Sequence, residues 1–431
     1  MKKLFTAISL MMVSASTCLA QGEAVIDTGD TAWMLISMAL VALMTPAGLT
    51  LFYGGLTTRK SVLNTIGMSY VSFCIATVVW VVVGYSIAFG EGNAIWGGLD
   101  HFMLWDIDIN SVSGTIPTIL FVGFQGTFAA IAVAIVSGSI IERVKFSTWL
   151  IFSGLWVALV YCPIAHWVWG GGFLSDHGEL DFAGGTVIHI NAGISGLILA
   201  LYIGKRKYHD HHTNRPASLK LMILGSALLW FGWFGFNGGS ELAADAIAAN
   251  ALLVTNVAAC IGGLTWMIIE WLTEDRKPTL LGSASGVVSG LVAITPAAGF
   301  VDVSGALVIG LFGAVVGYIG VVRIKAYLGY DDTLDAFGIH GLVGIFGALA
   351  TGLLANPKIN FGVGLFYGNP DQLWHQTKAV LVTMAYAGTA SIVLFKLTSL
   401  VTKGGRVHED LEQKGMDEGY HGETSINVNL D

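Results

Sequence analysis

Two histidines inside apolar segments carry the clearest chemical signal in this sequence. His189 lies in GGTVIHINAGISGLILAL, and His340 lies in FGIHGLVGIFGALATGLL. In both segments a glycine stands four residues and again seven residues after the histidine. An ionisable ring at membrane depth is costly, so it marks a functional site by default. Because the pattern occurs twice, on matching faces of small residues, it predicts two halves of one transport site.

A pair of facing imidazole rings has the chemistry to pass a small polar guest. Neutral imidazole has one hydrogen-bond donor and one acceptor, so two rings that share a proton still offer a further group. Desolvation favours the neutral rings. The alternative is that each ring bonds a backbone carbonyl and only holds helices together. The repeated pattern favours the first interpretation.

A second candidate site combines aromatic rings with a hydroxyl group. Its members stand beside glycine runs, on segments that flank the histidine segments: Phe124, Phe128, Trp169, Phe236 and Ser240. Aromatic faces attract a small cation that has shed its water, and a serine hydroxyl can accept a hydrogen bond from it. Aromatic residues near the ends of membrane spans are ordinarily interface anchors. The residues alone leave two interpretations, anchors or a cation-recruitment site at the outer mouth.

Asp181 and Asp335 are the carboxylates nearest to the predicted path. They precede the two histidines by eight and five residues, which is roughly 12 Å and roughly 8 Å of helix. Each stands just before a helical run, so we expect both to cap helix N-termini rather than to bind the cation. A carboxylate that bound the cation permanently would trap it instead of passing it on.

The composition is that of an integral membrane protein. Of the 431 residues, 54% are hydrophobic and only 12% are charged, against about 25% charged in soluble domains. The 56 glycines suit the close approach of helices in lipid. A net charge of −8 favours neither nucleic acid nor anionic lipid as a partner.

The first twenty residues have the layout of a secretory signal peptide. Two lysines begin it, the apolar core LFTAISLMMV follows, and STCLA ends in the small residue Ala20. We expect cleavage before Gln21, which implies export of the mature N-terminus. The rest of the chain divides into a transmembrane region, residues 21–401, and a tail, residues 402–431, which its sequence describes only as charged and partly disordered.

The predicted fold is an all-α membrane protein with eleven transmembrane helices, because each span needs about twenty apolar residues. The predicted spans are roughly 31–53, 63–90, 117–140, 147–172, 184–204, 217–238, 249–272, 279–299, 303–327, 337–355 and 373–401. Connections rich in lysine and arginine alternate with acidic ones, and the positive-inside bias places the basic set in the cytoplasm. The N-terminus then lies in the periplasm and the C-terminus in the cytoplasm.

The spans divide into two inverted five-helix repeats, at about 31–204 and about 217–355, with a final helix at 373–401. Five spans reverse the chain direction, so the two histidine helices enter from opposite faces. LFYGGL at the end of the first span and GFNGGS at the end of the sixth support this division. Substrate paths between inverted repeats lie near the midplane, and there we expect the two rings to meet.

Other polar groups carry weaker signals. The stretch with His209, Asp210, His211 and His212 resembles a metal site. Because it has no second ligand set, we interpret it as a solvated loop. His166 lies in an apolar segment without a counterpart in the other half, so we expect a structural role. The sequence has no phosphate-binding glycine loop, nucleophile elbow or zinc-ligand spacing. It therefore predicts no enzyme activity, no cofactor and no metal.

Taken together, these motifs resemble those of the ammonium transporters of the Amt/Mep/Rh family, and the bacterial Amt type in particular. The resemblance covers essentially the whole mature chain. It rests on LFYGGLTTRKSVLN, FGEGN, VGFQGTFA, ERVKFS, PIAHWVWGGG, LDFAGGTVIHINAGISGL, IGKRK, WFGFNGGS, KPTLLG, ITPAAGFV and DDTLDAFGIHGLVGI.

The resemblance implies a homotrimer in the bacterial inner membrane, with one pore through each eleven-helix subunit. Ammonium or ammonia is the implied substrate, with methylammonium as an analogue, and a PII-type regulatory protein is the implied partner of the cytoplasmic tail. The implied site residues, by role, are the outer ammonium site (Trp169, Phe128 and Ser240), the gate (Phe128 and Phe236), the twin histidines of the pore (His189 and His340) and the vestibule support (Asp181 and Phe124).

The expected mechanism follows from the cost of moving a bare cation through an apolar pore. We expect the outer site to recruit ammonium, the proton to separate beyond the gate, and ammonia to pass the histidines. Three alternatives stay open: a membrane redox enzyme with the histidines as haem ligands, an ammonium sensor that signals through its tail, and a channel for carbon dioxide.

Overall fold

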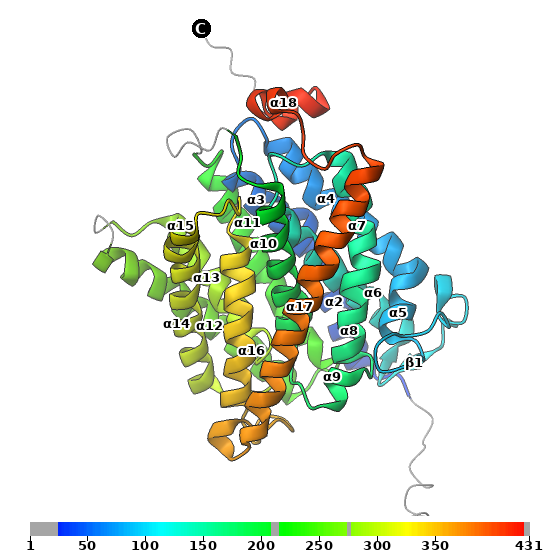
Figure 1. Cartoon of the computed structure of the whole chain (residues 1–431). Coiled ribbons are helices and arrows are strands. Elements are labelled where there is room, and N and C mark those ends of the chain that lie inside the picture. Colours follow the sequence, from blue (N-terminus) through cyan, green and yellow to red (C-terminus); the bar gives the residue numbers. More distant parts are fainter. Residues whose placement is uncertain (1–24, 208–214, 274–276, 426–431) are drawn as a thin grey trace, which may run out of the picture.

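The computed structural model describes residues 25–207, 215–273 and 277–425 (Figure 1). The signal peptide predicted for residues 1–20 and the histidine-rich loop at 209–212 lie outside the described residues. Within the described ranges the chain is nearly all helical, as its sequence predicts. Its strands there are a short antiparallel pair, β1 (Val112–Ser113) and β2 (Ile116–Pro117).

Most helices follow one another without a break, so that α-helices and π-helical turns form continuous rods. In the first half of the chain the helical elements are α2 (Thr28–Leu43), η1 (Met44–Leu49), α3 (Thr50–Leu56), α4 (Val62–Val79), η2 (Trp80–Gly84), α5 (Tyr85–Phe89), η3 (Phe102–Leu104), α6 (Thr118–Ser137), α7 (Phe146–Trp156), η4 (Val157–Tyr161), α8 (Cys162–Trp169), α9 (Phe173–Asp176), η5 (Gly185–Ile190) and α10 (Asn191–Ile203). In the second half they are α11 (Leu219–Trp233), η6 (Phe234–Gly238), η7 (Gly239–Glu241), α12 (Ala246–Thr273), α13 (Leu280–Ile294), α14 (Val303–Tyr318), η8 (Ile319–Ile324), α15 (Lys325–Leu328), η9 (Phe337–Leu342), α16 (Val343–Leu354), η10 (Leu365–Tyr367), α17 (Pro370–Val401), α18 (Glu409–Lys414) and η11 (Asp417–His421).

Ten rods within the described residues are long and apolar enough to cross a membrane. They are Thr28–Leu56, Val62–Phe89, Thr118–Ser137, Phe146–Asp176, Gly185–Ile203, Leu219–Glu241, Ala246–Thr273, Val303–Leu328, Phe337–Leu354 and Pro370–Val401. Each corresponds to one predicted span, with ends that differ by a few residues. The sequence pattern therefore locates ten of its eleven spans.

The eighth predicted span, residues 279–299, is shorter than expected. α13 has only 15 residues, and turns follow it to residue 300. Pro296 accounts for the early end, because proline has no N–H and disfavours a helical residue before it. Its carbonyl accepts a hydrogen bond from Phe182 N at 3.1 Å. The predicted count of eleven full-length spans is therefore not exactly met.

Glycine allows these helices to approach closely. In Figure 1, α17 runs along the bundle and packs against α7, α10 and α16. Elsewhere α12 packs against α13 and α14. A Cβ atom added to Gly290 of α13 would lie only 2.1 Å from the carbonyl oxygen of Ala258 in α12. The glycine-rich composition thus serves backbone contact between helices, as expected.

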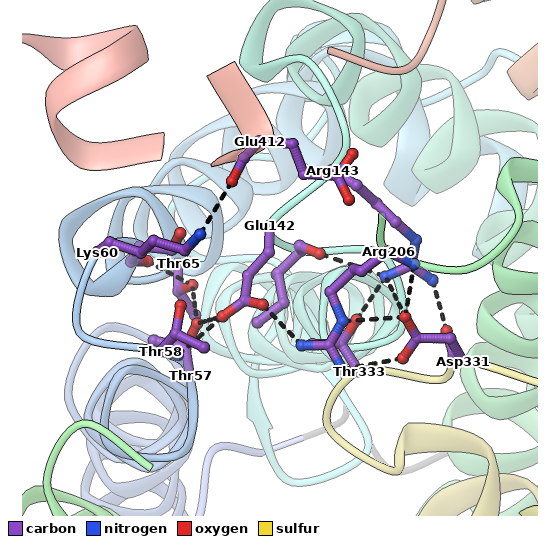
Figure 2. Close-up of polar contacts among 12 residues, drawn as sticks. Thr57, Thr58, Lys60, Thr65, Glu142, Arg143, Arg206, Asp331, Thr333 and Glu412 are labelled. Atoms are coloured by element: carbon purple, nitrogen blue, oxygen red, sulfur yellow. Dashed lines mark hydrogen bonds and ion pairs between the residues drawn. The ribbon is translucent and has the colours of Figure 1, made fainter. Parts of the chain in front are cut away.

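A buried ion-pair network joins the two halves at the end of the bundle that carries the tail (Figure 2). Arg206 lies at its centre and donates to Glu142 Oε2 at 2.6 Å and to both carboxylate oxygens of Asp331 at 2.9 Å. The Thr57 hydroxyl and the Thr58 N–H donate to the other oxygen of Glu142. Two-pronged contacts of this kind are the strongest that arginine makes with carboxylates.

This network sets the ionisation of its two carboxylates. Burial favours the neutral form of Glu142, but the Arg206 charge and the two threonine donors outweigh it and lower its pKa. Burial acts in the same sense on Asp331, but its hydrogen bonds with Arg206 and the charge of Arg143 hold its pKa well below the usual range. Both groups are therefore ionised at neutral pH.

Over residues 402–425 the tail folds back onto the membrane bundle, although its sequence alone indicates a partly disordered segment. Asp417, which is 2% exposed, accepts hydrogen bonds from the backbone N–H groups of Leu63 and Asn64 at 3.0 and 2.8 Å. It therefore caps the N-terminus of α4 from the far end of the chain. Glu412 binds Arg406 within the tail and the Lys207 N–H outside it.

Candidate functional site

The structure brings the two predicted site histidines, His189 and His340, together, although they are 151 residues apart in the sequence. The Nδ1 atoms of His189 and His340 are 3.1 Å apart. The ring planes are 19° from parallel, and the ring centroids are 5.2 Å apart. Both side chains are buried, with exposures of 1% and 6%. One Nδ1 must donate and the other must accept, so the pair shares one proton.

His189 also presents a polar atom that the protein does not satisfy. Its Nε2 atom has no hydrogen-bond partner within the described residues. The Trp233 ring stacks on the imidazole at 5.6 Å and 19°. The Trp233 N–H is already donated to Thr295 Oγ1 at 2.9 Å, so Trp233 offers only its face. A buried polar atom of this kind calls for a guest that can pair with it.

The glycines in the repeated pattern let the two histidine helices cross. Gly193, four residues after His189, lies against Gly341, and an added Cβ there would be 2.2 Å from the Gly341 nitrogen. Gly344, four residues after His340, lies against His189, with an added Cβ 3.1 Å from its Cβ atom. The four-residue spacing thus places each ring beside a gap in the opposite helix.

Asp181 caps the helix of His189, as its position predicts. Its two carboxylate oxygens accept hydrogen bonds from the backbone N–H groups of residues 184 to 187, at 2.6 to 3.1 Å. These are the groups that a helix N-terminus leaves without partners. Asp181 is therefore a helix cap and has no oxygen free for direct cation binding.

The predicted cap at Asp335 is wrong. Asp332 caps the helix of His340 instead, because its Oδ2 accepts the N–H of Phe337 at 2.7 Å. The Asp335 backbone has a positive φ of 62°, and its carboxylate accepts a hydrogen bond from Lys325 Nζ at 2.6 Å. Asp332 stands eight residues before His340, as Asp181 stands eight residues before His189. That equal spacing is the sequence signal that would have identified the correct residue.

The predicted aromatic residues form a continuous row of rings. Phe128 and Phe236 stack with centroids 4.4 Å apart and planes 17° from parallel. Trp169 meets Phe128 edge to face at 6.1 Å, and Phe124 meets it at 4.8 Å. At the other end, Phe236 lies 6.1 Å from His189. The row therefore connects Trp169 to the buried histidines.

Hydrogen bonds fix the polar groups at the start of this row. Trp169 Nε1 donates to the Asp181 carbonyl at 2.8 Å, which ties the indole to the loop before the His189 helix. Ser240 Oγ donates to the Phe236 carbonyl at 2.8 Å. Because the Ser240 proton is committed, its lone pairs are left to accept a hydrogen bond. The aromatic faces and this oxygen together suit a small cation with N–H donors.

The paired histidines also border a cavity. His340 lines a pocket of about 340 Å³ together with residues that include Tyr53, Leu56 and Asp335. On its other side, His340 borders a much smaller apolar space near Trp233. The row of rings, the paired histidines and the cavity thus follow one another in one line of contacts.

His166 takes no part in this line. Its two ring nitrogens face the carbonyl oxygens of Ala88 and Asn93 at 3.1 and 2.8 Å. It joins α8 to α5 and to the loop after α5, in keeping with the structural role expected from its sequence. Trp233 is the residue of the row that sequence reasoning overlooked, although its place in WFGF, three residues before Phe236, puts it on the same helix face.

Known proteins resemble this chain along nearly its whole length. A family model described as the Ammonium Transporter Family matches residues 32–426. The chain is 47% identical over 426 residues to an ammonium transporter of Aquifex aeolicus (strain VF5), covering 98% of this chain and 99% of the relative. It is also 47% identical over 399 residues to an ammonium transporter of Bacillus subtilis (strain 168), covering 92% and 98%.

The fold agrees with these sequence matches. The crystal structure of Mep2 from Saccharomyces cerevisiae superposes with a TM-score of 0.83 at 34% identity, covering 89% of this chain and 88% of that one. Both kinds of comparison lead to a membrane transporter rather than an enzyme. The chain belongs to the ammonium transporter family.

Proposed function

We propose that the chain recruits ammonium at the outer end of the aromatic row, removes a proton from it, and conducts ammonia past the paired histidines. The proposal rests on one observation above all: the unpartnered His189 Nε2 lies at the end of an apolar row that begins with acceptors for a cation. The outer site would consist of Trp169, Phe128 and Ser240.

The free-energy cost of burying a charge decides which species crosses the pore. A desolvated full charge inside an apolar pore is prohibitively costly, whereas ammonia is neutral and both donates and accepts hydrogen bonds. One N–H bond of ammonium breaks, its electron pair stays on nitrogen, and the proton goes to an acceptor. Ammonia then pairs with the free imidazole nitrogen. Potassium has no proton to release and is rejected.

The stacked phenyl rings of Phe128 and Phe236 would form the gate. At 4.4 Å between centroids they leave no room for water between them, so one ring must turn before a guest passes. The gate would thereby exclude hydrated ions, with Asp181 and Phe124 holding the vestibule in shape. Phe124 supports this role because it packs against both Phe128 and Gly239.

The arrangement in the membrane is part of the same proposal. We infer an inner-membrane protein with a cleaved signal peptide over residues 1–20, a periplasmic N-terminus and a cytoplasmic tail from residue 402. Two inverted repeats, 31–204 and 217–355, would supply one histidine each, and the matching eight-residue spacing from Asp181 and Asp332 supports that division. A homotrimer, and a PII-type protein docked at the tail, complete the proposal.

Proteoliposome currents test the role of the rings. In the double variant His189→Ala with His340→Ala, we expect loss of the normal ammonium response or loss of potassium rejection. His101→Ala changes a histidine in an outer loop, beside Asp106, and serves as the matched control. Full rate together with full rejection of potassium in the double variant would disprove the proposed role.

The haem alternative does not fit the ring geometry. Two imidazoles on opposite sides of one metal ion, with bonds of roughly 2 Å each, would hold their nitrogens about 4 Å apart. The Nδ1 atoms of His189 and His340 are at hydrogen-bond distance instead, and their rings stack.

A further inference from the structure

A buried carboxylate next to the proposed outer site has no compensation. Glu179 lies in the loop between α9 and η5 and is 9% exposed. Neither of its carboxylate oxygens makes a hydrogen bond of normal geometry within the part of the chain that the structure describes. A buried polar group in this condition is costly and needs an explanation.

The nearest groups on its own segment do not supply that compensation. Asp181 stands two residues further on, and its oxygens are already occupied by four backbone N–H groups. The Thr186 hydroxyl points to Glu179 without reaching normal hydrogen-bond geometry. Burial first, and then the Asp181 charge, raise the pKa of Glu179 well above its usual range. Burial without a hydrogen-bond partner therefore favours the protonated form of Glu179.

The neighbouring elements bring a phenol and an imidazole to this loop. The Tyr161 hydroxyl of η4, which feels the Asp181 charge, has no hydrogen-bond partner among the described residues. His375 of α17 lies against Gly178, where an added Cβ would be 2.9 Å from its Nδ1 atom. Gln376 of α17 holds the loop in place through two 2.8 Å hydrogen bonds with the backbone of Leu180.

The loop connects Glu179 to the aromatic row. Trp169 donates its indole N–H to the backbone carbonyl of Asp181. Glu179 is two residues from that carbonyl, a span of at most about 7 Å along the chain. A cation at the face of Trp169 would therefore lie within electrostatic reach of the buried carboxyl group.

We propose that Glu179 is a proton-binding site coupled to ammonium: it holds a proton while the outer site is empty and releases it when the cation binds beside Trp169. On release, the O–H bond of the carboxylic acid breaks, its electron pair stays on the carboxylate, and the proton passes to water. The proposal rests on the proposed outer site, because the bound cation must lie there.

The size of the coupling follows from Coulomb's law. Two unit charges roughly 8 Å apart, at an effective dielectric constant near 20, change each other's binding by about 30-fold. The effect is reciprocal, so ionised Glu179 must raise the affinity for ammonium by the same factor. Ammonium should therefore bind more tightly as the pH rises, over a range in which it is still the main species in solution.

Proton release on binding is the direct test. The full-length protein in nanodiscs, in weakly buffered solution with a pH-indicator dye, receives ammonium chloride or, for comparison, sodium chloride. Tryptophan fluorescence reports binding in the same sample. We expect up to one proton per subunit from the wild type, and binding without release from Glu179→Gln. Asp176→Asn removes an exposed carboxylate at the end of α9, three residues before Glu179, and should release as the wild type does.

The possible outcomes separate this inference from the function on which it rests. Ammonium binding by the wild type without proton release, or unchanged release from Glu179→Gln, would overturn the role of Glu179 alone. Unchanged ammonium binding by Trp169→Ala would instead overturn the outer site. Infrared difference spectra of the wild type give a readout that needs no variant: ammonium should remove one carboxylic acid C=O band, and its persistence contradicts the proposal.

Discussion

The two histidine helices begin alike but in opposite electrostatic surroundings. Asp181 and Asp332 each stand eight residues before a histidine and cap its helix. Near Asp332, Lys325 donates to the Asp332 carbonyl and to the Asp335 carboxylate. Near Asp181, the additional charged group is another acid, Glu179. A lysine thus lies near the helix cap at one end of the bundle, whereas a second acid lies near the cap at the other end.

This difference separates the end of the bundle that ion pairs hold together from the end where we propose that ammonium binds. At the end that carries the tail, Arg143 and Arg206 pair with Glu142 and Asp331, and each carboxylate has its partners (Figure 2). At the end that carries the aromatic row, Glu179 has no donor of normal geometry among the described residues. Glu179, whose neutral form depends on an exchangeable proton, lies near the proposed ammonium site. The ion-pair network around Arg206 lies where it holds helices together.

Removing the two helix caps should give the largest difference in stability between the two ends of the bundle. Asp181→Ala leaves four N–H groups without their acceptor and Asp332→Ala leaves one. At about 1 kcal/mol for each lost hydrogen bond, we expect a loss on the order of 4 kcal/mol for Asp181→Ala and on the order of 1 kcal/mol for Asp332→Ala. Thermal unfolding of the purified protein measures both. Equal losses would show that the two caps are equivalent.

A methyl group at the helix crossing should affect the first half more than the second. Gly193→Ala brings a Cβ to 2.2 Å from the Gly341 nitrogen, whereas Gly344→Ala brings one to 3.1 Å from the His189 side chain. Overpacking of this kind costs about 1–3 kcal/mol, so we expect that loss, with slower ammonium uptake, for Gly193→Ala. Gly344→Ala should lose less than about 1 kcal/mol. Uptake by Gly193→Ala at the wild-type rate would contradict the tight crossing.

The pH dependence of stability should have opposite signs at the two ends of the bundle. We expect this effect to be smaller than those of cap removal and of the added methyl group. The lowered pKa of Glu142 stabilises the fold above the unfolded value of about 4.3, and this gain is lost as the pH falls through the folded pKa. The raised pKa of Glu179 is a penalty that is absent at acid pH and grows as the pH rises through the unfolded value.

Melting curves from pH 4 upward check this contrast. With rising pH, the wild type should gain stability relative to Glu142→Gln and lose stability relative to Glu179→Gln. Asp176→Asn, at an exposed position, serves as the control and should follow the wild type. A parallel response of the two glutamine variants would remove the distinction between the two ends.

Sequence periodicity and composition predict much of the fold, because lipid leaves few alternatives to apolar helices. The matched pattern around His189 and His340 predicts that the rings meet, and the 3.1 Å contact agrees. The roles of Trp169, Phe128 and Ser240 stay predictions, since geometry alone does not show what binds.

The misjudged features depend on contacts between distant segments. Asp335 has the position of a cap in the sequence, but Lys325 draws its carboxylate away and Asp332 takes its place. The tail is polar, and its fold depends on contacts with the start of α4, more than 300 residues earlier. The lack of hydrogen-bond partners for Glu179 could not be predicted from the sequence, because it depends on how α17 packs against the loop.

The cap that Asp417 provides for α4 has a consequence for how the chain is made. Its acceptor oxygens reach the N–H groups of Leu63 and Asn64 from 354 and 353 residues away. During synthesis α4 is made long before Asp417. The N–H groups of Leu63 and Asn64 therefore gain these acceptors only after the tail has been translated. The N-terminal cap of α4 is therefore complete only when every membrane span before Asp417 has been translated.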